Sequence, residues 1–395
     1  MDILKLQQDN LIRSTSLEYV RDFYNEIEWG TRLIGIKGAR GVGKTTLMIQ
    51  RMKMTLENLE QARYISLDNI WFATHSLMDY TLTAVKEGVT HIYIDEIHHL
   101  KRWEQYLKNI YDTFPDLHIV FTGSSLLEID HSVADLSRRL LLYDMPGLSF
   151  REYLGFKGLN FPKISLRDIL YDNIKITNEV NPHQNILRKF HEYLKHGYYP
   201  FFIKDKEREY WVRVENMVST VIERDIPSLE NIDYVSLMKA KQLLGILSEQ
   251  APSTLNIEKT ARNIDISKNL LVKLLLLLDK SQILRLLYYK NERSPKSLAK
   301  PQKILFDNPS IAYSLGVADI GKVRESFLAS AFRGHVIGYP LKGDLLVDNR
   351  YLFEVGGSGK GFSQIANLPD SFIAADDMEF AFENKIPLWM FGFLY

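Results

Sequence analysis

A glycine-rich segment constrains the fold of this chain more than any other feature of its 395 residues. Residues 38–45 read Gly-Ala-Arg-Gly-Val-Gly-Lys-Thr and match G-x-x-x-x-G-K-[ST] at every fixed position. An apolar run at 33–36 precedes the segment, and a helical pattern that continues to Leu59 follows it. Glycines let successive backbone N–H groups turn inward around an anion where a side chain would block its approach. This arrangement predicts a phosphate-binding loop between a strand and a helix.

The polar side chains of the loop fit a nucleoside triphosphate with Mg²⁺. Lys44 would place a positive charge on the β- and γ-phosphates, and the Thr45 hydroxyl would ligate the metal. The helix that begins near Lys44 would point the positive end of its dipole at the phosphates. The predicted nucleotide-binding residues are Gly38, Ala39, Arg40, Gly41, Val42, Gly43, Lys44, Thr45 and Thr46.

Two carboxylates follow another apolar strand about fifty residues further on. Asp95 and Glu96 come directly after Ile92-Tyr93-Ile94, which places them at the carboxyl edge of a parallel sheet, where ligands bind in open α/β folds. Asp95 would hold magnesium through water, and Glu96 would orient and deprotonate the attacking water. His98 and His99 come next. Because adjacent residues of a helix point in different directions, a packed or solvated pair is favoured over a pair of metal ligands.

A hydroxyl-rich turn and two arginines complete the candidate site. Ser124, with Thr122 as the second choice, would reach the γ-phosphate from the turn after the next strand. Arg139, which follows Arg138, would stabilise charge on the transferred phosphoryl group of its own chain or of a neighbouring subunit. The alternative for these arginines is a surface ion pair, with Asp135 as the partner.

Short apolar strands alternate with helix-length segments up to residue 150. This alternation predicts an α/β fold with a parallel sheet and helices on both faces, including a fifth strand at 140–143. A helical region with a break at 197–200 follows, and then three helices, two of them separated by a turn like that of a helix-turn-helix. Strands return at 344–347, 351–355 and 387–393. The predicted divisions are an N-terminal helical segment (1–30), the phosphate-loop core (31–150), a helical lid-like region (151–232), a winged-helix-like region with a basic linker (233–303) and a C-terminal domain (304–395).

Composition excludes several classes of site. The chain has no cysteine, so disulfides, thiolate metal sites and cysteine nucleophiles are ruled out. Its 49 basic and 49 acidic residues balance, which argues against a dedicated nucleic-acid coat. The most apolar run, 270–278, is too short to span a bilayer. We therefore expect a soluble, cytoplasmic protein with no membrane partner.

With these motifs in place, the chain resembles bacterial and archaeal AAA-type ATPases that carry a C-terminal domain of uncharacterised function. The resemblance covers almost the whole length, and Leu-Ser-Phe-Arg-Glu-Tyr-Leu at 148–154 is specific because generic P-loop proteins lack it. It implies an AAA-like core that binds ATP, a winged-helix region and a C-terminal domain that resembles the restriction-endonuclease fold. The segments that carry it are 37–46, 93–98, 121–125, 135–139, 147–154, 197–200 and 353–357.

The last domain departs from the endonuclease pattern at one position. Glu325, Asp344 and Glu354 fit the three acidic roles by order and spacing, but Gly356 stands where those nucleases carry a lysine. Lys360 would reach that place only through an excursion of the loop. The resemblance therefore implies a degenerate scaffold that binds DNA or a partner more than it implies an active nuclease.

A basic segment at 285–303 is a second candidate for DNA binding. It holds six basic residues against one acid, with Tyr288 and Tyr289 beside them, so it reads either as a wing that tracks phosphates or as a solvated linker. The basic residues are Arg285, Lys290, Arg293, Lys296, Lys300 and Lys303.

Three functions remain open from the sequence. The main hypothesis is a Mg²⁺-dependent ATPase that acts as a switch or motor, with a homo-oligomer and a protein partner as further expectations. The first alternative is a nucleotide-gated DNA- or protein-binding module with little turnover. The second alternative is an ATP-dependent nuclease.

Overall fold

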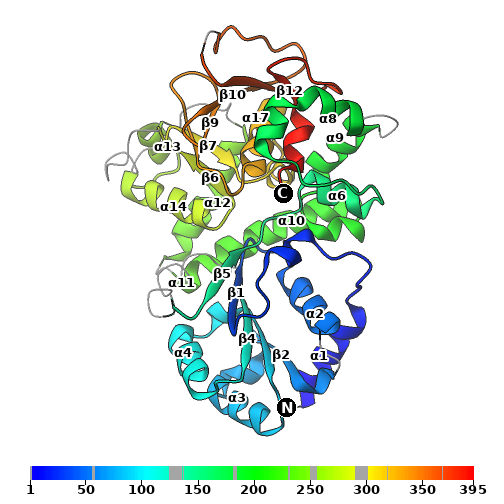
Figure 1. Ribbon diagram of the computed structural model, residues 1–395. Helices are drawn as coiled ribbons and strands as arrows, with labels where there is room; N and C mark the ends of the chain where they lie inside the picture. The colour runs from blue at the N-terminus through cyan, green and yellow to red at the C-terminus, as the bar shows by residue number, and fades with distance from the viewer. Residues whose placement is uncertain are drawn as a thin grey trace. The chain divides into compact units, whose positions relative to one another are not determined.

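The chain folds into two compact units in a computed structural model (Figure 1). The first unit comprises Met1–Gly147 with Ser228–Glu230, and the second comprises Leu148–Pro227 with Asn231–Tyr395. Each unit contains its own five-stranded sheet. The structure describes residues 2–55, 58–123, 136, 138–180, 185–229, 232–249, 256–289, 301–317, 319–366 and 368–395.

A parallel sheet forms the centre of the first unit. Its strand order is β2-β3-β4-β1-β5, and every neighbouring pair is parallel. The middle residues of the inner strands are apolar and buried, because helices cover both faces of a parallel sheet. The predicted α/β class is confirmed, with a fifth strand close to where it was expected. The strands are β1 (Leu33–Lys37), β2 (Ala62–Ser66), β3 (His91–Asp95), β4 (His118–Gly123) and β5 (Leu141–Asp144).

Within the described residues, four helices cover this sheet. Helices α3 and α4 bury Tyr80, Trp103 and Leu107 in one cluster with the strand residues Ile94 and Phe121, and α1 and α2 lie together beside β2 and β4 (Figure 1). The interior of this unit is therefore built by its own helices and strands. The helices are α1 (Asp2–Ser14), α2 (Lys44–Thr55), α3 (Leu77–Lys86) and α4 (Trp103–Thr113).

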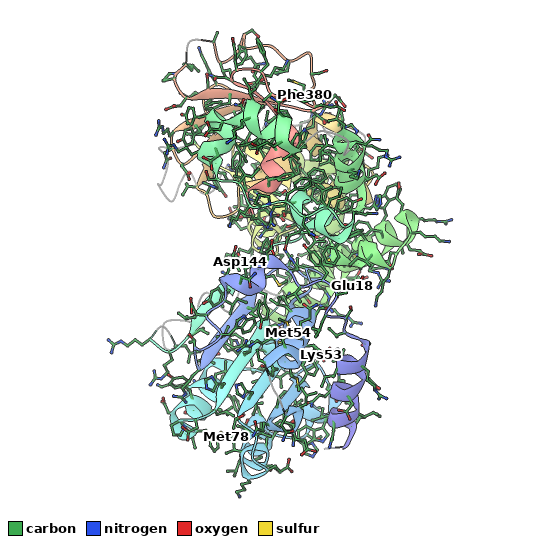
Figure 2. All side chains as sticks on the ribbon, turned by 45° about the vertical axis from the view of Figure 1, so that its right-hand side comes forward. Glu18, Lys53, Met54, Met78, Asp144 and Phe380 are labelled. Atoms are coloured by element: carbon green, nitrogen blue, oxygen red, sulfur yellow. The ribbon has the colours of Figure 1, made fainter. Side chains whose placement is uncertain are left out.

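The end of α2 differs from the prediction. The helical pattern suggested a helix to Leu59, but α2 ends at Thr55. Asn58 has extended backbone angles, and its side chain accepts a hydrogen bond from Glu60 N–H. A local side-chain bond of this kind competes with continuation of a helix. Figure 2 labels Lys53 at the same end of α2. Its Nζ donates to the carbonyls of Ile12 and Thr15 at 3.0 and 2.6 Å and links the end of α1 to α2.

Helices make up most of the first half of the second unit. The predicted break is present, since α9 ends at His196 and a 3-10 turn begins at Pro200. A turn with Asp265 in the left-handed region separates α13 from α14, which Ser267 caps. The helices of this part are α6 (Phe150–Phe156), α7 (Leu166–Tyr171), α8 (Asn173–Val180), α9 (Ile186–His196), α10 (Glu207–Thr220), α12 (Tyr234–Glu249), α13 (Ile257–Asn263) and α14 (Lys268–Lys280). The short α11 (Ile226–Leu229) begins in this unit and ends in the first.

A two-stranded antiparallel sheet follows α14. It joins β6 (Leu284–Leu287) to β7 (Lys303–Phe306). The winged helix that the sequence suggested for this region stays a prediction. Whether this region binds DNA stays a prediction.

The second five-stranded sheet lies in the last part of the chain. Its order is β12-β11-β10-β9-β8, with parallel pairing from β10 to β12 and antiparallel pairing elsewhere. Two helices, α16 (Pro309–Ser314) and α17 (Ile320–Ala331), precede it. The strands are β8 (Ile337–Gly338), β9 (Leu345–Val347), β10 (Tyr351–Gly356), β11 (Ser371–Ala375) and β12 (Lys385–Pro387).

One predicted strand of this sheet is wrong, and two strands, β8 and β11, were not predicted. Residues 388–393 form a 3-10 helix after the short β12, and all six are buried. A short run buried on every side has no periodicity that separates a strand from a helix. Strand β8 is only two residues long, and β11 contains serine and two alanines, residues that a strand pattern does not favour.

No helix in the described ranges has the length and apolar character needed to cross a membrane.

Candidate nucleotide site

The glycine-rich segment forms the turn between β1 and α2. Gly41 and Gly43 have φ angles of 84° and 102°, in the left-handed region that glycine enters without strain. Gly38 lies so close to the chain that a β-carbon there would stand 2.3 Å from the carbonyl oxygen of Met145. The backbone therefore requires glycine at both glycine positions that the motif fixes, Gly38 and Gly43, and also at Gly41.

Lys44 lies inside this loop. Its side chain is buried, and its Nζ donates to the carbonyl oxygens of Gly38 and Ala39, each at 2.9 Å. These contacts hold the ammonium at the start of α2, beside backbone N–H groups that have no acceptor within the first turn of a helix. A cation and converging N–H donors form a site for phosphate oxygens.

Asp95 lies at the carboxyl end of β3, and hydroxyl groups hold it. The carboxylate accepts hydrogen bonds from Thr45 Oγ1 at 2.6 Å, from the Tyr64 hydroxyl at 2.9 Å and from Thr122. Burial, followed by the neighbouring Glu96 carboxylate, raises the pKa of Asp95, while the three hydrogen bonds oppose that shift. Carboxylate and hydroxyl oxygens are the hard ligands that Mg²⁺ prefers, so Thr45 and Asp95 fit that ion.

The strand order explains why Thr122 reaches this acid. Because β4 lies between β1 and β3, its end stands between the phosphate loop and Asp95. Thr122 donates to Asp95 and accepts a hydrogen bond of 3.2 Å from the backbone N–H of Glu96. Ser124, the first choice from the sequence, lies outside the described residues.

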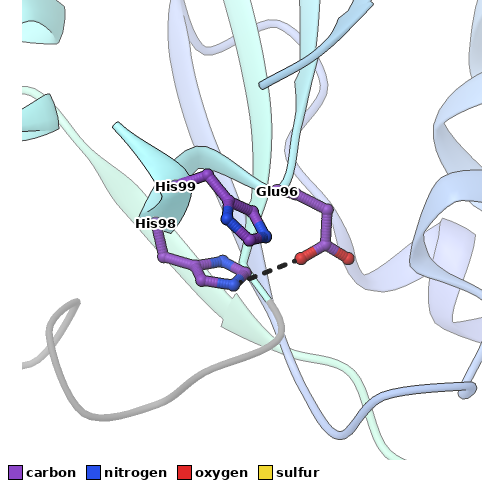
Figure 3. A group of neighbouring side chains, drawn as sticks. All are labelled: Glu96, His98 and His99. Atoms are coloured by element: carbon purple, nitrogen blue, oxygen red, sulfur yellow. Dashed lines mark ion pairs between the residues drawn. The ribbon is translucent and has the colours of Figure 1, made fainter. Parts of the chain in front are cut away.

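Glu96 begins a tight turn after β3. Its backbone is left-handed, with φ 54° and ψ 47°, and a 3-10 turn over Ile97–His99 follows. Its Oε2 lies 3.4 Å from Nε2 of His98, and the dashed line in Figure 3 marks this pair. Burial and the adjacent His99 lower the pKa of His98 to about 3, so this imidazole is neutral near pH 7.

The two histidines differ from the sequence expectation. His98 is buried and His99 is exposed, yet their ring centroids are only 4.6 Å apart and the rings are inclined by 33° (Figure 3). Their different directions were expected from α-helical geometry. A single 3-10 turn after a left-handed residue does not have that geometry, so both rings come to the same side as Glu96.

Arg139 lies away from the phosphate loop, at the opposite end of the strands. Its guanidinium pairs with Asp112 near the end of α4, at 3.1 and 3.3 Å. The neighbouring Tyr111 accepts a hydrogen bond through its carbonyl from Arg32, the residue directly before β1. Arg139 therefore stands at the amino ends of the strands, and the predicted contact with the phosphate of its own chain is wrong. Its role towards a neighbouring subunit stays a prediction, and Asp135 lies outside the described residues.

Two residues that support the site were not predicted from the sequence. Arg21 donates to the carbonyls of Val42, Pro146 and Gly147 at 3.2, 2.6 and 2.9 Å. These bonds link the phosphate loop to the segment after β5. Tyr64 reaches Asp95 from β2. No motif marks Arg21. The position of Tyr64 on the strand before β3 is the only signal that pointed to it.

The acids of the C-terminal domain also come together, but around lysines. Nζ of Lys303 lies 2.9 Å from Glu325 Oε1 and 3.0 Å from Asp344 Oδ1. Lys360 pairs with Glu354 at 2.5 Å. Burial raises the pKa of Glu325 to about 7. The three acids predicted from spacing thus share one neighbourhood, and Lys303 supplies a positive charge that the sequence did not place there.

Gly356 explains how Lys360 reaches Glu354. A β-carbon at Gly356 would stand 2.8 to 2.9 Å from three carbons of the Lys360 side chain. The glycine therefore leaves the space in which the lysine lies. The endonuclease pattern has a lysine at the position of Gly356. In this chain the glycine at that position leaves room for Lys360, which pairs with Glu354.

Comparison with known proteins agrees with this description of the first unit. Residues 30–154 match a family model described as an AAA domain. Together with the parallel sheet and the phosphate loop, this match defines the region as an AAA-type P-loop domain. Residues 187–322 match a domain of unknown function, DUF8612. The endonuclease-like character of the C-terminal domain stays a prediction.

One relative and several solved structures are similar over most of the chain. An uncharacterized protein of Methanocaldococcus jannaschii is 30% identical over 319 residues, which cover 77% of this chain; the chain spans 64% of the length of that relative. AMPPCP-bound DnaA from Aquifex aeolicus is 15% identical, with 71% of this chain and 86% of that chain covered and a TM-score of 0.29. PCH-2 from C. elegans is also 15% identical, with 69% and 66% covered and a TM-score of 0.26.

Proposed function

We propose that this chain is a Mg²⁺-dependent ATPase of the AAA type that works as a nucleotide-driven switch or motor. The hydrogen bond of 2.6 Å from Thr45 to Asp95 carries the proposal, because it joins the end of the phosphate loop to the acid after β3. Mg²⁺, when bound, would be held by Thr45 and Asp95 and would neutralise charge on the phosphates.

The chain's own groups would bind the nucleotide and move the proton. Backbone N–H groups at Gly41 and Gly43 cradle the phosphates, and Lys44 neutralises the β- and γ-phosphate oxygens. Glu96 accepts the proton of the attacking water. Thr122 orients Glu96, because its hydroxyl accepts the hydrogen bond of the Glu96 backbone N–H. Ser124 remains the proposed contact of the γ-phosphate.

The Glu96→Gln variant tests this assignment. Loss of a general base costs about 10²–10⁴-fold in rate. We expect steady-state ATP turnover to fall by that factor while the Kd for ATP stays the same, since Gln keeps the shape of the side chain. The control is Glu60→Gln, an exposed glutamate of the same unit that should leave turnover unchanged. Unchanged hydrolysis in Glu96→Gln would exclude Glu96 as the base.

A second candidate is a nucleotide-gated binding module with little turnover. It is favoured by the contact between Glu96 and His98, which draws the carboxylate towards a buried ring. Purified protein that retains ADP and hydrolyses no ATP, with or without DNA or a protein partner, would support this candidate. Turnover that begins when DNA is added would support the switch or motor instead.

For a DNA partner, we propose the region of α13, α14 and the β6–β7 pair as the contact. The segment 285–303 contributes less than its sequence suggests, because two of its basic residues face inward. Arg285 pairs with Asp307 at 2.8 Å, and Lys303 lies among the acids of the C-terminal domain. We propose that this domain is a binding scaffold. The nuclease alternative requires DNA cleavage with Mg²⁺ or Mn²⁺ that Glu354→Ala removes.

A further inference from the structure

The turn after β3 brings three metal-ligating side chains together. Glu96, His98 and His99 each offer one ligand atom, and these three atoms all lie within 4.8 Å of one another (Figure 3). The chain reaches this arrangement because the left-handed Glu96 and the 3-10 turn Ile97–His99 direct all three side chains to one side. The Thr122 hydroxyl fixes the Glu96 backbone from β4. The group is therefore held by the sheet and is not a chance contact of mobile surface side chains.

The distances within the group suit a tetrahedral cation. Zinc lies about 2.0–2.2 Å from nitrogen and oxygen ligands, so two ligand atoms on one tetrahedron are roughly 3.4 Å apart. The distance from His98 Nε2 to Glu96 Oε2 is 3.4 Å. Small rotations of the exposed His99 would bring its nitrogen to the same separation, because its ring already lies 4.6 Å from that of His98. Two imidazoles and one carboxylate leave the fourth position for water.

The type of ligand separates this group from the magnesium site. Mg²⁺ prefers oxygen ligands in octahedral geometry, which Thr45 and Asp95 can offer. Imidazole nitrogen instead favours zinc and similar transition metals. His98 is buried and His99 is exposed, so a cation would enter from the side of His99 and rest against His98.

We propose that Glu96, His98 and His99 form a site for a divalent transition-metal ion, with Zn²⁺ as the expected ion. The ion would hold the carboxylate of Glu96, so that this oxygen no longer accepts the proton of water. A bound ion would then stop ATP hydrolysis without preventing ATP binding. This regulatory role rests on the proposed function, whereas the site itself does not.

Binding is tested with Co²⁺ on the full-length chain after removal of nucleotide and metal. Co²⁺ in a site with two imidazoles and one carboxylate gives an intense visible absorption, and we expect one equivalent to saturate it. His99→Ala, at an exposed position, should weaken Co²⁺ by at least about tenfold, because changes in the shell around a metal's ligands already cost 10–100-fold. His98→Asn is the second variant, since it keeps a polar side chain at the buried position.

Two controls address the other histidines of the same unit. His75→Ala removes an exposed histidine that stacks on Trp71. A double variant, His91→Ala with His118→Ala, removes a stacked pair whose ring centroids are 4.9 Å apart. Both should keep the cobalt spectrum. A spectrum that survives in His99→Ala, or disappears in the double variant, would overturn the site.

Turnover is then measured with Mg-ATP at buffered Zn²⁺ concentrations, each variant being compared with its own zinc-free rate. Wild type should lose at least about 90% of its rate at saturating Zn²⁺, on the general-base scale, and His99→Ala should keep most of its own. Cobalt binding through His99 without zinc inhibition would overturn the regulatory role alone. A chain that binds cobalt but hydrolyses no ATP would overturn the proposed function and its regulation, and would leave the site in place.

Discussion

Two groups of acidic side chains in the described part of the chain, one in each unit, are held in different ways. Asp95 of the first unit accepts three hydroxyl hydrogen bonds and makes no ion pair with a lysine or arginine in the described ranges. Glu325 and Asp344 of the second unit share the ammonium of Lys303. A hydroxyl leaves the charge of a carboxylate available to a cation, whereas an ammonium neutralises it in place. In the second unit Glu325 and Asp344 are therefore already paired with a basic side chain, whereas Asp95 keeps its charge for a cation.

Lys303→Met should have the largest effect on stability. Removal of one partner from a buried ionic group leaves uncompensated charge and costs about 3–5 kcal/mol. We expect the free energy of unfolding of the second unit to fall by that amount, as measured by chemical denaturation. The control is Lys259→Met on α13, an exposed lysine. A loss no larger than that of the control would show that the acids do not depend on Lys303.

A second substitution tests whether Lys303 stabilises the fold by neutralising Glu325. Glu325→Leu added to Lys303→Met removes an acid that the first substitution leaves unpaired. The double variant should be more stable than Lys303→Met alone, since well-packed apolar groups replace buried ion pairs at little cost. If the double variant is the less stable of the two, Glu325 is stabilised by something other than Lys303.

Thr122→Val should lower the free energy of unfolding by less than Lys303→Met does, because a hydroxyl and not a charged group supports Asp95. The change leaves the Glu96 N–H and one oxygen of Asp95 without this partner, a loss of about 1–3 kcal/mol. ATP turnover should fall with it, since Glu96 loses its anchor. Thr83→Val, on the exposed side of α3, is the control for the loss of a threonine hydroxyl. Full turnover in Thr122→Val would remove Thr122 from the site.

The pKa of Glu325 predicts a pH dependence of the second unit. Burial raises this pKa from 4.5 to about 7, so the folded state binds the proton more tightly than the unfolded state. The free energy of unfolding should therefore fall as the pH rises from about 4.5 to about 7, by on the order of 1–3 kcal/mol. Glu325→Gln should flatten the curve relative to wild type. The same slope in both proteins would assign the pH dependence to another group.

Arg139→Ala should have the smallest effect. Its pair with Asp112 is partly exposed, and such pairs contribute about 0–1 kcal/mol. Because Arg139 lies at the edge of the sheet away from the phosphate loop, turnover of dilute, monomeric protein should not change. A large loss of monomer turnover would contradict that placement. A loss that occurs only in assembled protein would support a role for Arg139 in a neighbouring subunit.

The sequence predicted the parts of the site that backbone geometry dictates. The phosphate loop, the strand ending at Asp95 and the parallel sheet follow from glycine positions and strand periodicity, which are local properties. Strand order is not local. The place of β4 between β1 and β3, and with it the contact of Thr122 with Asp95, could not be obtained from the spacing of motifs.

The C-terminal domain shows the same limit for side chains. The order and spacing of Glu325, Asp344 and Glu354 predicted that these acids belong together. No sequence pattern indicated that Lys303 would lie among them. The glycine at 356 suggested a missing lysine, although it provides the space for Lys360. Contacts between residues far apart in sequence depend on packing, which a linear motif does not contain.

The magnesium site is tested by the Mg²⁺ dependence of ATP turnover in wild type and in Asp95→Asn. If Thr45 and Asp95 hold the ion, wild-type turnover will require Mg²⁺, and Asp95→Asn will remain folded while its turnover falls by at least about 10²-fold, the scale of a lost charge-stabilising group. Wild-type turnover without any divalent ion, or undiminished Mg²⁺-dependent turnover in Asp95→Asn, would contradict the account.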